Sequence, residues 1–365
     1  MRRHVTALVG LGGVLSAVGV ASAHVKYVTD ERGTTDPLQF LIAALTEPLN
    51  AALLLGGGLA VVAVVAAYLW FRPLRADLRA ARRALRSYRD LLPWMLRLSV
   101  GLPLVGAGYN GYFFSPVLQP QGLEVAVRLF GIGIGFLLLF GFATRLVASV
   151  GLAGFLFALA AAPAEAMLSF EYLPAFVAIV LLGGGRPSAD HVIHRLADDE
   201  RTVYSTVDPI HRRLVEPFRR LVEPYEPLAP TAVRVGMGVA FVYLGLSEKL
   251  LAPAQALAVV EKYHLAALGP FPPELWVIGA GLTEMAVGLA LIAGFLTRGV
   301  TGVAFLLFTT TLFGLPDDPV LAHVSLFGLA SVLLVTGSGP YALDRRLERL
   351  RAGQGVDAGT GEIAD

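Results

Sequence analysis

Long runs of apolar residues are the feature that most limits how this chain can fold. Several runs approach 20 residues, as at 274–296 and 319–337, and a helix of about that length crosses the roughly 30 Å hydrocarbon core of a bilayer. Hydrophobic residues make up 55% of the chain and charged residues only 16%, with a mean hydropathy of +0.66. Soluble domains carry about 25% charged residues. The sequence therefore predicts an all-α integral membrane protein whose main partner is the lipid bilayer.

Charge and cysteine content narrow the possible chemistry. The formal net charge is +1 and no basic patch with interleaved aromatic residues is present, so no nucleic-acid partner is predicted. The chain has no cysteine, which excludes disulfides, iron–sulfur clusters and c-type haem. A bis-histidine haem b needs two histidines in the membrane, and only His323 lies in a predicted span. His191 and His194 are spaced i, i+3 without an obvious third ligand, so no metal site is predicted.

The N-terminal part is predicted to hold a targeting segment followed by helices. Residues 1–23 combine two arginines, an apolar core and the small-residue sequence "ASA", which is typical of a cleaved secretory signal peptide. An uncleaved first transmembrane helix is the alternative. Segment 24–92 is predicted to contain an outer stretch, a transmembrane helix at 50–71 and an Arg-rich amphipathic helix at 72–89, which would lie on the cytoplasmic membrane surface.

Alternating spans allow the orientation to be predicted. Further apolar spans are expected at 94–114, 124–143, 146–164, 172–184, 232–250, 274–296, 299–315 and 319–337. Arginine-rich segments then all fall on one side of the membrane, which the positive-inside rule makes cytoplasmic. The sequence thus predicts a multi-pass cell-membrane protein with its linker at 191–230 and its tail at 346–365 in the cytoplasm. The loops at 251–273 and 316–319 face outward.

Internal similarity organises the rest of the chain. "RLSVGLPLVGAGYNGYFFSP" from Arg97 aligns with "RVGMGVAFVYLGLSEKLLAP" from Arg234, and "GFATR" at 141–145 aligns with "GFLTR" at 294–298. The sequence therefore predicts two tandem four-helix transmembrane bundles, at 93–190 and 231–345. Its proline content predicts that the linker between them is a short amphipathic helix plus extended chain.

The four-span pattern resembles the DoxX family of small membrane proteins. The resemblance lies in "RVGMGVAFVYLGLSEKL", in an acid within the next span followed by "GFLTR", and in a closing "GSGP" with "LDRRL". It covers about 231–346 well and 93–190 in outline, because the first half lacks the acids. Members of this family are associated with membrane redox systems, and one branch contributes to a thiosulfate:quinone oxidoreductase. The resemblance implies a four-helix fold and an accessory or quinone-interacting role.

Charged residues inside spans mark the candidate site. Glu284 lies near the middle of its predicted span, where a carboxyl costs several kcal/mol unless it is paired, hydrated or protonated. Lys249 shares a helical face with Gly245 and should point into the bundle. Glu248 is turned about 100° from it and is interpreted as its surface partner. His323 lies on the outer part of the last span.

The first repeat lacks all of these side chains. It carries Gly111, Tyr112, Gly131 and Ser169 where the second carries Glu248, Lys249, Glu284 and His323. The joint loss predicts that Glu284, Lys249 and His323 converge on one polar cavity in the second repeat. Glu248, Tyr263 and His264 are predicted to contribute to binding there. The structural alternatives are a Lys249 that extends to the headgroups, a neutral packing carboxyl at Glu284 and an ordinary buried histidine at His323.

Three functions stay open at this point, and the sequence does not decide whether the protein is an enzyme. The first is an accessory or quinone-interacting subunit of a membrane redox system. The second is a carrier for a small solute or a proton-coupled carrier, in which Glu284 titrates. The third is a membrane scaffold that assembles a partner oxidoreductase on its basic cytoplasmic surface. The first of these functions implies a quinone as cofactor.

Overall fold

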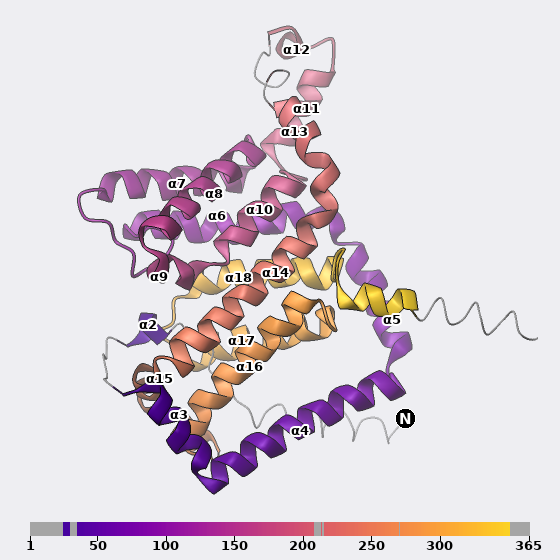
Figure 1. The fold of residues 1–365 in the computed structure, drawn as a ribbon. Coiled ribbons are helices and arrows are strands. Elements are labelled where there is room, and N and C mark those ends of the chain that lie inside the picture. The colour runs from indigo at the N-terminus through magenta and orange to yellow at the C-terminus, as the bar shows by residue number, and fades with distance from the viewer. Residues whose placement is uncertain (1–24, 30–34, 208–212, 214, 270, 351–365) are drawn as a thin grey trace, which may run out of the picture. The chain divides into compact units, whose positions relative to one another are not determined.

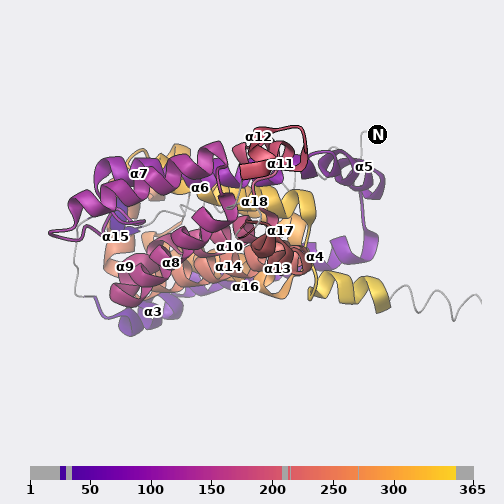
Figure 2. The same ribbon diagram turned by 90° about the horizontal axis from the view of Figure 1, so that it is seen from above.

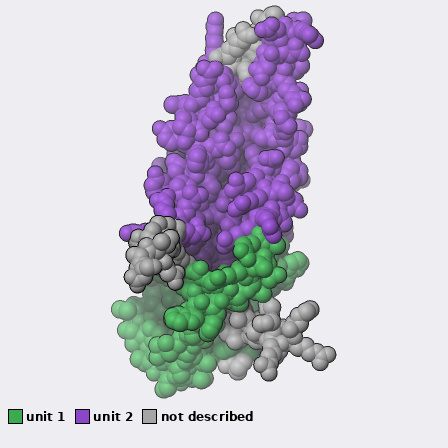
Figure 3. Space-filling model, turned by 90° about the vertical axis from the view of Figure 1, so that its right-hand side faces the viewer, with its two compact units in different colours: residues 1–81, 241–286, 306–319 green, residues 82–240, 287–305, 320–365 purple. Residues whose placement is uncertain are grey.

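The structure, a computed structural model, describes residues 25–29, 35–207, 213, 215–269 and 271–350. The predicted signal segment and most of the C-terminal tail lie outside these residues. All regular elements among the described residues are helices, which confirms the all-α fold class. Contacts divide the chain into two compact units, shown in different colours in Figure 3. Unit 1 comprises residues 1–81, 241–286 and 306–319, and unit 2 comprises residues 82–240, 287–305 and 320–365.

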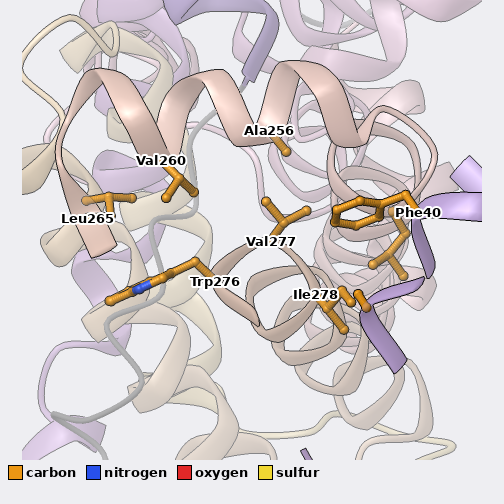
Figure 4. Close-up of a cluster of buried hydrophobic side chains, with 9 residues drawn as sticks. Phe40, Ala256, Val260, Leu265, Trp276, Val277 and Ile278 are labelled. Atoms are coloured by element: carbon orange, nitrogen blue, oxygen red, sulfur yellow. The ribbon is translucent and has the colours of Figure 1, made fainter. Parts of the chain in front are cut away.

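Unit 1 contains the helices between the first two spans of the second predicted repeat. Its own elements are α2 (Val25–Val28), α3 (Pro37–Thr46), α4 (Pro48–Phe71), the π-helical turn η5 (Leu244–Leu250), α15 (Pro253–Lys262) and η6 (Leu265–Leu268). Its core cluster contains Phe40 of α3, Val260 of α15 and Trp276. Figure 4 shows Phe40 at the opposite end of this cluster from Trp276, with Val277 between them. Burial of such large apolar groups provides most of the packing energy of a small unit.

Unit 2 contains the first predicted repeat. Its own elements are η1 (Arg89–Leu91), α6 (Leu92–Asn110), α7 (Glu124–Phe140), α8 (Thr144–Ala161), α9 (Pro163–Ala166), η2 (Met167–Ser169), α10 (Tyr172–Leu182), α11 (Ala189–Asp198), α12 (Val203–Val207), α13 (Glu216–Val222), η4 (Glu223–Leu228) and α18 (Val320–Thr336). Helices α6, α7, α8 and α10 pack against one another, and α18 packs against α6 (Figures 1 and 2).

The remaining helices contribute residues to both units. They are α5 (Arg75–Arg86), α14 (Ala229–Tyr243), α16 (Pro273–Ala293) and α17 (Thr297–Gly314). The Arg-rich α5 falls inside the predicted amphipathic segment and has no buried residue.

Several helices have the length and composition of membrane spans. Among the described residues five qualify, at 48–71, 89–110, 144–161, 216–250 and 273–293. A sixth arises if the two helical pieces at 163–169 and 172–182, which meet at a 58° bend, form one broken span. The short span predicted at 172–184 thus has helix on both sides of Glu171. These helices support a multi-pass protein in a lipid bilayer.

Equivalent arginines in the two predicted repeats donate hydrogen bonds to the C-terminal ends of equivalent helices. Arg97 and Arg234 are both buried. The Arg97 guanidinium donates to the carbonyl oxygen of Leu138 at the end of α7 (3.2 Å), and that of Arg234 donates to the carbonyl oxygen of Leu291 near the end of α16 (2.7 Å). Because the last carbonyls of a helix have no partner within the helix, both arginines satisfy the same need. The duplication itself stays a prediction.

The linker differs from its prediction. It was expected to include extended chain because of its prolines, but its described part is mostly helical, and residues 216–250 form one long helical stretch. Pro217 and Pro224 occupy the first turns of α13 and η4. A proline in that position costs little, because the N–H it removes has no partner there. Pro217 and Pro224 therefore start helical segments instead of ending them.

Candidate functional site

The first component of the site is a π-helical turn at the end of α14. Residues 244–250 leave the α-helical pattern, and the N–H of Leu251 donates to the carbonyl oxygen of Leu246 (2.8 Å), five residues back. A π-helix turns less per residue than an α-helix, and such turns occur often at functional sites. Consequently Glu248 and Lys249 are both buried, with 0% and 3% of their surface exposed. The alternative in which Glu248 is a surface partner of Lys249 is therefore excluded, and its predicted role in binding stays a prediction.

Lys249 forms a buried ion pair with Glu284. Its Nζ lies 2.8 Å from Oε2 of Glu284, whose side chain is fully buried on α16. Two glycines permit this approach, because a Cβ on Gly245 would lie 2.7 Å from the carbonyl oxygen of Gly281. Lys249 therefore does not extend to the headgroups, and the helices meet closely enough for the two charges to touch.

Glu248 binds a different partner from the one expected. Its Oε2 accepts the backbone N–H of Lys26 (3.1 Å), and the Nζ of Lys26 lies 3.5 Å from Oε1. Lys26 belongs to the short helix α2 and is separated from Glu248 by 222 positions. Glu248 thus attaches the N-terminal segment to η5 within unit 1. The sequence pattern could not indicate a contact over that separation.

Asp318 is a further buried carboxyl that the sequence analysis missed. It lies in the loop between α17 and α18 and is 2% exposed. Burial raises the pKa of Asp318 to about 7, and the positive charge of Lys249 opposes that rise. Lys249 therefore interacts with a second carboxyl besides Glu284. The doublet of acids in "PDDP" was the available signal.

Tyr263 connects the segment that follows α15 to the loop between α17 and α18. Its hydroxyl donates to Oδ2 of Asp317 (3.0 Å), and Nζ of Lys262 lies 2.8 Å from the same oxygen. These two hydrogen bonds lower the pKa of Asp317. His264 is exposed and begins η6 with a φ of 52°. That Tyr263 and His264 help to bind a ligand stays a prediction.

A small cavity reaches the buried lysine. Its volume is about 20 Å³, and its lining includes Lys249, Trp276 and Val260. Trp276 and Val260 are labelled in Figure 4. This volume is about the room that one water molecule occupies. Trp276 is 9% exposed, and within the described part of the chain its indole N–H has no hydrogen-bond partner. Since buried donors normally have one, the cavity offers a place for an acceptor atom.

His323 belongs to unit 2 and is buried on α18. The ion pair between Lys249 and Glu284 lies in unit 1. The structure thus brings together two of the three residues predicted to form the site. The participation of His323 stays a prediction.

In the first repeat, aromatic side chains fill the region that follows α6. The ring of Phe114 makes edge contacts with those of Phe130, Phe155 and Tyr172, at centroid distances of 5.9, 5.2 and 5.1 Å. This repeat nevertheless contains a buried acid, at a position other than those that align with Glu248 and Glu284. Glu171 lies at the bend of the broken span and accepts a hydrogen bond from Ser325 of α18 (3.4 Å).

Gly131, which replaces Glu284 in the first repeat, is expected to have a packing role only. A Cβ there would lie 2.9 Å from the Cα of Gly108 and from the carbonyl oxygen of Leu104. Gly131→Ala should therefore lower the free energy of unfolding by about 1–3 kcal/mol, as overpacking does. Gly133→Ala is the control on the same helix, because a Cβ there meets nothing within 4 Å. Equal melting temperatures for the two variants in detergent would contradict the packing role.

One part of the chain matches a known protein family. Residues 229–323 match the family model described as DoxX, so the resemblance to this family is confirmed there. The matched part includes Glu248, Lys249 and Glu284. No curated protein and no solved structure matched the chain significantly.

Proposed function

Because residues 229–323 form a DoxX domain, we propose that this membrane protein is an accessory, quinone-interacting subunit of a membrane redox system. The observation that carries the proposal is the buried ion pair of Lys249 and Glu284, together with the cavity beside it. A buried ion pair gains little stability over apolar residues of the same volume. Its presence at this depth is therefore better explained by chemistry than by packing.

The arrangement suits a neutral acceptor that gains or loses protons. The cavity has room for a single oxygen atom and not for a quinone ring. Its donors are the Lys249 ammonium and the indole N–H of Trp276, and a quinone carbonyl oxygen that entered it would accept from both. With a quinone bound, Lys249 and Trp276 would hold its carbonyl oxygen, and Glu284, which is paired with Lys249, would be the group placed to give or take the proton that accompanies quinone reduction or quinol oxidation. The electrons would come from the partner oxidoreductase.

Trp276 provides a reporter for a direct test. In a variant with Trp70→Phe and Trp94→Phe, Trp276 is the remaining tryptophan of three, and a short-chain quinone should quench its fluorescence saturably. Glu284→Gln keeps the shape but removes the charge of the acid, so quinone affinity should fall by about 10-fold or more, as for a lost hydrogen bond to a charged group. Glu274→Gln, in the first turn of the same helix, is the control. Equal quenching of both variants would exclude the pair from quinone binding.

The broken span favours a second candidate function, a proton-coupled carrier. Interrupted helices at membrane depth commonly line substrate and ion sites in transporters. Here the interruption holds Glu171 against Ser325. Uptake of a solute into proteoliposomes driven by a pH gradient, and its loss in Glu171→Gln, would favour the carrier. Co-purification of an oxidoreductase from native membranes would favour the redox subunit.

The proposed orientation places the linker and the C-terminal tail in the cytoplasm. Because the chain contains no cysteine, single cysteines report topology without background. Asp317→Cys should react with a membrane-impermeant thiol reagent added outside intact cells, whereas Arg213→Cys should react only after the membrane is opened. Labelling of position 213 in intact cells would overturn the orientation.

A further inference from the structure

A cavity in unit 2, lined by residues that lie outside the DoxX match, has the properties of an anion site. It has a volume of about 270 Å³ and lies between the start of α8, the loop at 184–188, α11 and α13. Pockets that hold small ligands begin at about 300 Å³, so the cavity has room for a compact group. Its outer edge includes the two histidines, His191 and His194, for which no role was found in the sequence.

Three arginines and two histidines form most of its polar lining. They are Arg145, Arg186, Arg219, His191 and His194, whereas Asp190 is the carboxylate among the described lining residues. Both oxygens of Asp190 are already occupied, because they accept the backbone N–H groups of Ala143 (2.6 Å) and Thr144 (2.8 Å). The carboxylate therefore caps α8 and leaves the arginines to act on a ligand.

The arginines differ in what they can still bind. Arg219 is paired with Glu216 and Glu223, and Arg145 donates to the carbonyl oxygens at the end of α10 through Nε and Nη2. Arg186 is exposed and has no ion pair within 4 Å among the described residues. Its guanidinium is thus available to an incoming anion, and Arg145 lines the same cavity.

A buried hydroxyl supplies a second, independent observation. Thr144 lines the cavity and is fully buried, and its Oγ1 has no hydrogen-bond partner among the residues that the structure describes. In the second repeat the corresponding Thr297 donates through Oγ1 to Asp344 (2.9 Å). Only the first repeat leaves the hydroxyl available, and Gly184 keeps the space beside it open, since a Cβ there would lie 2.8 Å from Oγ1.

The electrostatic environment of His191 agrees with a site for a negative group. Desolvation lowers the pKa of His191, and the positive charges of Arg186, Arg195 and His194 lower it further. A bound anion would offset these charges and raise that pKa.

We propose that this cavity binds the phosphate group of an anionic ligand through Arg186, Arg145 and the Thr144 hydroxyl. Guanidinium groups bind phosphate oxygens through paired, charge-assisted hydrogen bonds. The phosphate is that of an anionic phospholipid headgroup or of a soluble phosphate compound. Both sources share the chemistry that the cavity recognises.

Two probes distinguish the sources with the full-length protein. Inorganic phosphate is titrated into protein in a neutral detergent, and the melting temperature and the NMR pKa of His191 are followed. Native mass spectrometry then compares retention of phosphatidylglycerol and phosphatidylcholine after extraction from mixed nanodiscs. Wild-type protein should show a saturable rise in both solution readouts, or selective retention of phosphatidylglycerol.

The variants decide whether the cavity is responsible. Arg186→Gln and Thr144→Val should each weaken the response by about 10-fold, whereas Arg195→Gln, an equal loss of charge on the exposed side of α11, should not. Thr144→Val removes a hydroxyl without a partner, so folding should be retained. A response confined to phosphatidylglycerol identifies a lipid site, and one confined to phosphate identifies a soluble ligand. No response, or equal effects of Arg186→Gln and Arg195→Gln, would overturn the proposal.

Discussion

Lys249→Met is expected to lower the free energy of unfolding by about 3–5 kcal/mol, because it leaves the fully buried carboxyl of Glu284 without its cation. Methionine retains the length and flexibility of the side chain, so the loss reflects charge and not volume. Unfolding of the purified protein by titration with sodium dodecyl sulfate in mixed micelles measures the change. Lys262→Met is the matched control, since its ion pair with Asp317 is half-exposed and such pairs are worth at most about 1 kcal/mol.

The double variant separates stability from function. Lys249→Met combined with Glu284→Met replaces the buried ion pair by apolar side chains and should recover most of the lost stability. It should nevertheless fail to bind quinone, because the charged groups that act on the ligand are gone. If the double variant remains as unstable as Lys249→Met, the pair is part of the packing of this unit. If it is stable and still quenched by quinone, the pair has no role in binding.

How much of the site the sequence could predict depends on the range of each contact. Lys249 and Glu284 were expected to point into the second bundle because small residues share their helical faces, and the structure pairs them directly. The partner of Glu248 lies 222 positions away in a four-residue helix, for which no periodicity exists. The burial of Glu248 also depends on the π-helical turn, and hydrophobic periodicity assumes an α-helix throughout.

The buried acids outside the regular spans show the same limit. Asp317 and Asp318 are adjacent, yet one is exposed and paired with Lys262 while the other is buried near Lys249. Glu171 lies at a bend between two helical pieces, where hydropathy suggests only a helix end. In each case the position of the side chain is set by tertiary packing of a loop, which composition does not encode. The all-α membrane fold, by contrast, follows from composition and span length alone.

Stability should fall as the pH rises from about 4 to 7, and Asp318 should be a main cause. Its pKa is about 7 in the folded protein, whereas the ordinary pKa of an aspartate side chain, which applies to the unfolded chain, is 3.8. Between these values the folded state holds a proton that the unfolded state has released. The contribution of Asp318 to the free energy of unfolding is therefore fully present below pH 3.8 and is lost as the pH rises to about 7. A shift of this size corresponds to a loss on the order of 4 kcal/mol.

Asp318→Asn should remove this slope, because an amide stays neutral at every pH in the range. The melting temperature of the variant in detergent should thus change less between pH 4.5 and 8 than that of the wild type. Asp317→Asn is the control: the hydrogen bonds from Lys262 and Tyr263 lower the pKa of Asp317, so its contribution is lost only as the pH falls below about 4. Lys249→Met should move the Asp318 transition to a higher pH, since the charge that opposes the shift is gone. A wild-type slope that Asp318→Asn leaves unchanged would show that another group takes up the proton.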